Sequence, residues 1–141
     1  MVLQESAQMY LKNILIIANR KGEVRSIDLA EEMGFSKPSV SRAVHLLEDN
    51  GFLRIEEDGS LKLTDAGRRE AISVYQRHLV LMQFLTSIGV SEPMADDDAC
   101  KIEHIISDET FAKLQDLLTE QDIPYPQATE DELFAFTKHQ K

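Results

Sequence analysis

Hydrophobic residues recur at helical spacing in the first part of the chain, between residues 5 and 20. This stretch contains no glycine or proline, and its larger apolar side chains include Met9, Leu11, Ile14, Leu15 and Ile17. An α-helix brings positions three and four residues apart onto one face, so the pattern predicts a helix with one buried side. We expect this helix to end at residues 21–22, a lysine followed by a glycine.

Two further short helices are predicted before Gly51, separated by the turn residues 34–36. Ser26 is expected to cap the first of them and Gly34 to close it, because serine favours the N-cap position and glycine the position after a helix. Ser36 is expected to cap the second helix, which Gly51 ends. Two short helices joined by a tight turn are typical of a helix-turn-helix.

The second helix of this pair carries Pro38 in its first turn, where a missing N–H costs no hydrogen bond. Its predicted core face, at i, i+4 and i+7 spacing, consists of Val40, Val44 and Leu47. Residues 52–57 and 60–64 then alternate between apolar and polar around Asp58-Gly59, the dipeptide that suits a two-residue type I′ hairpin turn. Three helices followed by a hairpin form the order of a winged helix-turn-helix domain.

The rest of the chain also has a helical pattern. Thr64 is expected to begin a long helix to about residue 88, Ser91 and Pro93 a shorter one, and Ser107 another. A linker with two prolines follows, and residues 129–132 form a capping box for a short last helix over residues 129–139. The predicted fold is therefore mostly α, with a winged helix-turn-helix over residues 1–70, a helical domain over 71–122, and a linker with a short C-terminal helix over 123–141.

Charge divides the chain into two parts. The net charge is −10, but residues 1–80 hold 11 Lys/Arg and 12 Asp/Glu, whereas residues 81–141 hold 4 and 13. The nearly neutral first part can present a local basic face to phosphate, and the acidic second part would repel it. The single cysteine fits a reducing cytosol, and the apolar run at 14–18 is too short to span a bilayer. We therefore expect a cytoplasmic protein without a membrane partner.

A helix-turn-helix places the first turns of its second helix in the major groove of DNA. Six residues of those turns are candidate base or phosphate contacts: Ser36, Lys37, Pro38, Ser39, Ser41 and Arg42. On the hairpin, Arg54 and Lys62 are candidate phosphate contacts. A single lysine or arginine is more often simply solvated, but a cluster on this scaffold favours DNA binding.

Residues 96–107, "DDDACKIEHIIS", contain the only cysteine of the chain, a glutamate and a histidine at helical spacing. Positions i, i+3 and i+4 share a helix face, so Cys100, Glu103 and His104 would point the same way. A thiol, a carboxylate and an imidazole together indicate a divalent metal site that lacks further ligands. Taken singly, each residue is more often a packed core residue, as are Met9 and His78. No HExxH motif, nucleophile elbow or clear acidic pair indicates an enzyme.

Several segments together resemble the diphtheria toxin repressor and manganese transport regulator family over about residues 5–120: "SAQMYLKNI", "LKLTDAGRREA", "RHLVLMQFL" and "DDACKIEHIIS". The pattern AC-x-x-EH-x-x-S is the most specific of them. The resemblance, to the short form without an SH3-like domain, implies a cytoplasmic homodimer that binds operator double-stranded DNA when loaded with divalent metal. It also implies that the second domain mediates dimerisation, and that the metal lies between this domain and the first helix.

By this resemblance, Met9, Cys100, Glu103 and His104 match the DNA-activating metal site of the iron-responsive branch. His78 matches a histidine of a second metal site in that branch, and a ligand in the manganese branch. The implied function is a repressor of metal-uptake genes, in which Met9 connects the DNA-binding domain to the ion.

The chain also departs from both branches. The manganese branch has carboxylates in place of Met9 and Cys100, and a ligating glutamate in place of Lys12. The iron branch has a glutamate in place of Met82 and a histidine in place of Asp96. We therefore expect one well-formed site, and a second one only if His78 rebuilds it with a nearby carboxylate such as that of residue 96 or 98.

Mixed sulfur, nitrogen and oxygen donors suit a borderline divalent ion better than Mg²⁺ or Ca²⁺. The expected order is Fe²⁺, then Mn²⁺, with Zn²⁺, Co²⁺ or Ni²⁺ binding in vitro. The alternative is a metal-independent winged-helix regulator that senses an organic ligand or the oxidation of Cys100, its second-domain helices serving only for dimer packing.

Overall fold

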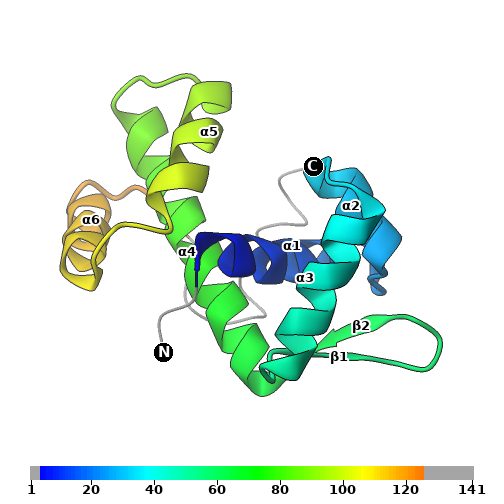
Figure 1. Ribbon diagram of the computed structural model, residues 1–141. Helices are drawn as coiled ribbons and strands as arrows, with labels where there is room; N and C mark the ends of the chain where they lie inside the picture. The colour runs from blue at the N-terminus through cyan, green and yellow to red at the C-terminus, as the bar shows by residue number, and fades with distance from the viewer. Residues whose placement is uncertain (1–3, 126–141) are drawn as a thin grey trace. The chain divides into compact units, whose positions relative to one another are not determined.

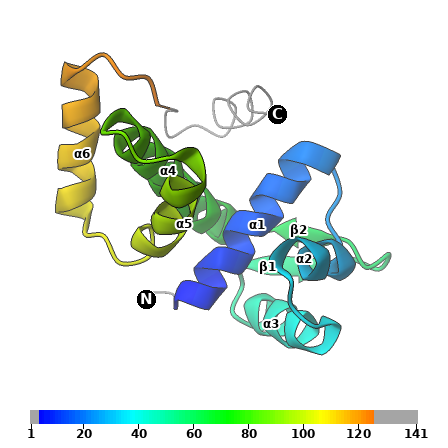
Figure 2. The same cartoon turned by 90° about the horizontal axis from the view of Figure 1, so that it is seen from above.

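A computed structural model describes residues 4–125, so the last helix predicted from the sequence, over residues 129–139, lies outside the described residues. The described chain forms six α-helices and two β-strands (Figures 1 and 2). In chain order these are α1 (Glu5–Lys21), α2 (Ser26–Met33), α3 (Lys37–Asp49), β1 (Leu53–Ile55), β2 (Leu61–Leu63), α4 (Asp65–Ser87), α5 (Glu92–Ile102) and α6 (Asp108–Glu120). The predicted mostly helical fold with an N-terminal winged helix-turn-helix is confirmed.

By its contacts the described chain divides into two compact units, residues 4–72 and 73–125. In the first unit α1 lies against α2, α3 and β2, and α3 lies against β1. Helix α4 begins in the first unit and continues in the second. Among residues 4–125, no helix is both long and apolar enough to cross a membrane.

The helix-turn-helix is held by a small apolar core under α2 and α3. Val40, Val44 and Leu47 of α3, the predicted core face, are all buried, and Leu29 of α2 is buried with them. Between the two helices Gly34 has φ 69° and ψ 28°, a left-handed conformation that glycine adopts without a Cβ penalty. Ser36 caps α3 as predicted, its hydroxyl accepting the N–H of Ser39 at 3.3 Å.

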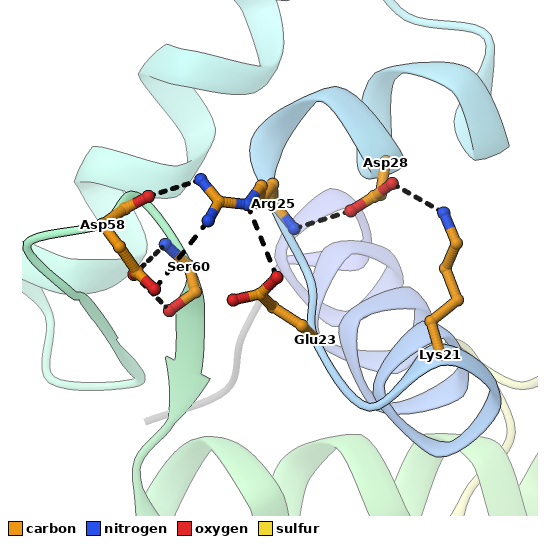
Figure 3. Close-up of polar contacts among 6 residues, drawn as sticks. All are labelled: Lys21, Glu23, Arg25, Asp28, Asp58 and Ser60. Atoms are coloured by element: carbon orange, nitrogen blue, oxygen red, sulfur yellow. Dashed lines mark hydrogen bonds and ion pairs between the residues drawn. The ribbon is translucent and has the colours of Figure 1, made fainter.

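The cap of α2 differs from the prediction. Ser26 is the first helical residue, and Arg25 occupies the N-cap position. The backbone N–H of Arg25 donates to the carboxylate of Asp28 at 2.8 Å, and Lys21 Nζ donates to the same carboxylate at 2.9 Å (Figure 3). An acidic side chain in the first turn thus does the capping that we had assigned to a serine hydroxyl.

The wing hairpin also differs from the prediction, in its turn. Leu53 pairs with Leu63 and Ile55 with Leu61, and Glu56 N–H donates to the carbonyl of Ser60 at 2.9 Å. This register leaves a loop of three residues, 57–59, in which only the glycine has a positive φ, of 87°. A type I′ turn needs positive φ at both central residues, so the predicted two-residue turn is wrong.

Arg25 joins this turn to the start of α2. Its Nη1 donates to the carbonyl of Asp58, its Nη2 lies 3.8 Å from the Asp58 carboxylate, and its Nε lies 3.6 Å from that of Glu23 (Figure 3). Asp58 in turn accepts the N–H of Ser60 at 3.0 Å and its hydroxyl at 2.7 Å. These hydrogen bonds hold the pKa of Asp58 below its usual value, chiefly through Ser60. The wing tip is therefore fixed by side chains from before and within the hairpin.

The start of α4 packs directly on the backbone before β1. Thr64 caps α4 as predicted, its hydroxyl accepting the N–H of Gly67 at 3.2 Å, and Thr64 N–H donates to the carbonyl of Phe52 at 3.1 Å. A Cβ at Gly67 would lie 1.9 Å from that carbonyl oxygen. Glycine is therefore required here by close approach, although its φ is ordinary.

In the second unit, α5 lies beside the C-terminal half of α4 (Figures 1 and 2). Its Ala95 and Ala99 are fully buried, and these small residues allow the helix to approach its neighbours closely. Ser107 caps α6 as predicted, its hydroxyl accepting the N–H of Thr110 at 3.1 Å. This arrangement brings one face of α4 next to the polar residues of α5.

Candidate metal centre and nucleic-acid interface

His78 lies on α4 and is the centre of a polar group within the second unit. His78 is 8% exposed, and both of its ring nitrogens have a carboxylate neighbour. Nδ1 lies 2.8 Å from Oε1 of Glu103, and Nε2 lies 2.9 Å from Oδ1 of Asp96. An imidazole that contacts two carboxylates is well oriented to bind a cation through one nitrogen and donate a proton from the other.

Asp96 and Cys100 come from the same face of α5. They are four residues apart, so one turn of helix places both side chains toward α4. Cys100 Sγ lies 3.8 Å from His78 Nδ1. The ligand atoms of His78, Asp96 and Cys100 all lie within 4.8 Å of one another, close enough for a single ion to contact all three. Imidazole, carboxylate and thiol donors thus lie in one cluster within the second unit.

Glu103 adds a second carboxylate to this group. Helix α5 ends at Ile102, one residue before it, whereas we had expected one helix to carry the whole motif. Glu103 nevertheless keeps helical angles, φ −56° and ψ −25°, and its N–H donates to Ala99 O at 2.9 Å. Its side chain is therefore still directed back along the α5 face, where it is fully buried against His78.

His104 follows in the turn after α5. Its side chain is 1% exposed, and its Nε2 lies 3.5 Å from Oε2 of Glu103. Glu103 thus lies between the imidazoles of His78 and His104, with one oxygen toward each. A buried carboxylate is costly unless hydrogen-bonded or paired with positive charge, and two imidazoles or a divalent cation both meet that requirement.

This donor set fits a borderline transition-metal ion. Two carboxylates, a thiol and imidazole nitrogens give mixed O, S and N donors, which favour Fe²⁺, Co²⁺, Ni²⁺ or Zn²⁺ over Ca²⁺. The structure places His78, which we had assigned to a second site, in direct contact with Glu103 of the first. Asp96, one of the two carboxylates expected to rebuild a second site, is the one that contacts His78.

Met9 lies on α1, in the first unit, and is half-buried. Its carbonyl oxygen accepts the side-chain amide of Asn13 at 2.8 Å. Lys12 is buried on the same helix. By the resemblance, it stands where the manganese branch has a ligating glutamate. Both residues belong to the unit that carries the helix-turn-helix.

Helix α3 exposes most of the residues expected to contact DNA. Ser36, Lys37, Pro38, Ser41 and Arg42 are exposed, and Ser39 is half-buried. Two of the serines have a local role as well, because the hydroxyls of Ser36 and Ser39 lie 2.9 Å apart at the helix cap. Arg42 Nη2 donates to the Ser39 hydroxyl at 3.4 Å. The guanidinium of Arg42 is thus held over the first turn of α3.

A shallow recess of about 320 Å³ adjoins this turn. It is lined by Ser26 and Ile27 from the start of α2, and by Lys37 and Ser41 from α3. Neither Ser26 nor Ile27 was singled out as a DNA contact from the sequence. The sequence pattern gave no reason to include these two residues, because it does not show that the start of α2 adjoins the first turns of α3.

The two cations of the wing lie side by side. Arg54 of β1 and Lys62 of β2 are direct partners in the strand register, and both are exposed. Like charges directly opposite on a sheet repel each other, so an anionic partner such as a phosphate would stabilise this pair. Glu56, 3.8 Å from Arg54, partly balances it.

Two models of known protein families match consecutive parts of the chain. Residues 2–61 match the iron dependent repressor N-terminal DNA binding domain, and residues 64–123 match the iron dependent repressor metal binding and dimerisation domain. The diphtheria toxin repressor of Corynebacterium glutamicum is 32% identical over 117 residues, which are 82% of this chain and 51% of the relative. The HTH-type transcriptional regulator MntR of Lysinibacillus sphaericus is 33% identical over 113 residues, 80% of this chain and 81% of the relative.

Solved structures of metal-dependent regulators are also similar to this chain. The structure of the manganese regulator SloR is similar with a TM-score of 0.73 and 26% identity, covering 84% of this chain and 54% of that one. A manganese-dependent transcriptional repressor in complex with manganese is similar with a TM-score of 0.70 and 30% identity, covering 84% and 53%. The chain thus spans about half the length of these structures and of the diphtheria toxin repressors that it matches.

Proposed function

Because this chain belongs to the iron-dependent repressor family, whose members are metal-dependent transcriptional regulators, we propose that it represses metal-uptake genes when it has bound Fe²⁺ or Mn²⁺. In this proposal the loaded protein binds operator DNA as a homodimer. The observation that carries it is the convergence of His78, Asp96 and Cys100 within 4.8 Å, on the same chain as a helix-turn-helix.

We propose that the ion is held by the group around His78. Cys100 would bind it as thiolate and His78 through one ring nitrogen, while Asp96 and Glu103 supply carboxylate oxygens. The ion would provide positive charge and fixed coordination where the protein otherwise offers only hydrogen bonds. His104, which adjoins Glu103, is included as a ligand or as a partner that orients that carboxylate.

On the DNA side, we propose that α3 enters the major groove. Lys37 and Arg42 are exposed on its first turns and can reach a guanine edge or phosphate, and Pro38 can contact a thymine methyl group. Arg54 and Lys62 would contact phosphates from the wing. Because two recognition helices must reach half-sites about one DNA turn or more apart, the geometry of a dimer would control affinity.

The test begins by selecting DNA ligands from a random-sequence pool with Mn²⁺-loaded protein, because no operator is assumed. Binding of the selected duplex is then measured anaerobically with Fe²⁺, Mn²⁺, Co²⁺ and Zn²⁺, beside a chelated control. We expect tight binding only with metal, and at two protein chains per duplex.

Equal affinity in chelator would contradict the proposal and favour the alternative regulator that senses an organic ligand or oxidation of Cys100. A matched control is Asp97→Ala, on the same helix and exposed, which should leave the metal midpoint unchanged.

A further inference from the structure

Arg77 immediately precedes His78 on α4 and contacts the chain just beyond the turn that carries Glu103 and His104. Its Nη1 donates to the carbonyl oxygen of Ile106 at 2.7 Å, and its Nη2 donates to the carboxylate of Asp108. The Arg77 side chain is only 15% exposed. Arg77 and His78 therefore both contact the segment that follows α5. Arg77 does so through Ile106 and Asp108, and His78 through Glu103.

The guanidinium of Arg77 has a third partner. Its Cζ lies 5.1 Å from the centroid of the Phe111 ring, on the first turns of α6, in cation–π geometry. Arginine presents its N–H donors in a rigid planar fork, so a ring face, a carbonyl and a carboxylate together fix one orientation. Lysine has a single ammonium group and cannot reproduce all three contacts.

The segment that Arg77 contacts is a turn, and its position depends on how its two ends are held. At the first end, the N–H groups of Ile105 and Ile106 both donate to Ile102 O at 3.0 Å. Ile105 is 77% exposed, so its packing contributes little to the position of the turn. At the second end, Ile106 and Asp108 are the residues bonded by Arg77.

We propose that Arg77 is a positioning residue for the candidate metal centre. By holding Ile106 and Asp108 against α4, it fixes the turn that places the carboxylate of Glu103 between the imidazoles of His78 and His104. Arg77 does not bind the ion. The inference rests on the proposed function, because the ion is the one that this centre is proposed to hold.

Residues that orient metal ligands typically change metal affinity about 10- to 100-fold when they are removed. We expect Arg77→Met to weaken Co²⁺ binding by about 10-fold or more. It should also shift the cobalt d–d bands and reduce the thiolate-to-cobalt absorption from Cys100, because both report ligand geometry. Arg77→Lys should show the same change, since it keeps the charge but not the fork.

The experiment is an anaerobic Co²⁺ titration of the full chain followed by absorption, with urea unfolding of each apo variant to compare folding. Asp108→Ala removes one arm of the contact, and because its side chain is 96% exposed it keeps the test valid if Arg77→Met does not fold. It should weaken Co²⁺ binding by a smaller factor. Lys113→Met, an exposed cation on α6, is the control and should match wild type.

The possible failures are distinguishable. Folded Arg77 and Asp108 variants with the wild-type Co²⁺ midpoint and spectrum would overturn the role of Arg77 alone. If wild type gives no cobalt absorption, or if Glu103→Ala leaves it unchanged, the proposed metal centre is wrong and this inference is overturned with it.

Discussion

His78 has a carboxylate at each ring nitrogen, and a neutral imidazole has only one N–H to donate. An ion at one nitrogen would remove this conflict, because the other nitrogen then keeps its proton and donates to the carboxylate beside it. Glu103 is the buried member of the pair, whereas the Asp96 side chain is 57% exposed. Removal of the two carboxylates should therefore have unequal effects on metal binding.

We expect Glu103→Ala to nearly abolish metal-dependent DNA binding and Asp96→Ala to weaken it less. Removal of Glu103 takes away a ligand and the partner of both imidazoles, whereas water can replace an exposed carboxylate. The measurement is the metal midpoint of duplex binding by fluorescence anisotropy. Equal midpoints for Glu103→Ala and wild type would place the metal site elsewhere.

Asp28 offers a pH-dependent prediction. The hydrogen bond from Lys21, then that from Arg25 N–H, lowers the pKa of Asp28 below its usual value, against a smaller opposing effect of burial. A lowered folded-state pKa means stability that is present above about pH 4, the unfolded value, and lost as pH falls through the folded pKa. Asp28→Ala should therefore reduce the free energy of unfolding by about 1 kcal/mol at pH 7.

The check is urea unfolding of Asp28→Ala and wild type between pH 7 and pH 2. The difference between the two proteins should shrink below about pH 4 as the wild-type carboxylate is protonated. Asp28→Asn separates the charge from the hydrogen bond, since it can still accept from Arg25 N–H. A difference that stays constant with pH would contradict the ionic part of this explanation.

At the scale of elements, helices were predictable because their signals are local. Thr64 and Ser107 cap α4 and α6 as expected, and Gly34 ends α2 in the left-handed conformation. The hairpin turn was not predictable, because its register depends on residues before it. Val24 O accepts the N–H of Leu61 at 2.8 Å, and no dipeptide rule includes such a contact.

The candidate centre was predictable only in part, for the same reason. Cys100, Glu103 and His104 are adjacent in the sequence, so helical spacing was enough to group them. His78 lies 25 residues before Glu103 and 18 before Asp96, and only the packing of α5 on α4 joins them. Residue types alone therefore indicated the chemistry of the site without its full membership.

Gly67 shows how an element junction constrains one residue. We expect Gly67→Ala to destabilise the protein by about 3 kcal/mol, because the new Cβ would meet a backbone carbonyl that cannot rotate away. The check is the urea midpoint, with Ser73→Ala, exposed on the same helix, as the control. A Gly67→Ala variant as stable as the control would show that α4 can shift away from Phe52 at little cost.

At the scale of the whole molecule, the proposed switch has to be driven by differential metal affinity. Moving a population from 1:99 to 99:1 needs about 5.5 kcal/mol, and an ion at about 1,000 times its dissociation constant supplies roughly 4 kcal/mol. Metal binding of that strength gives a useful but not absolute switch.

Met9 tests whether the first unit takes part in this switch. If its thioether joins the ion, Met9→Ala should leave a folded protein whose DNA binding needs more metal, by about 10-fold. Met33→Ala, another half-buried methionine of the same unit, is the matched control for loss of packing. The readout is a gel-shift titration with Mn²⁺. An unchanged midpoint would restrict the metal centre to the second unit.

The solvent exposure of Asp96 has a consequence for how such a regulator would report on its surroundings. The Asp96 side chain is 57% exposed, while the neighbouring imidazole and the second carboxylate are nearly enclosed. An ion held here would exchange with the medium on the Asp96 side, without any unfolding of the core. The fraction of protein with bound metal would then follow the current concentration of free metal and would not depend on earlier concentrations.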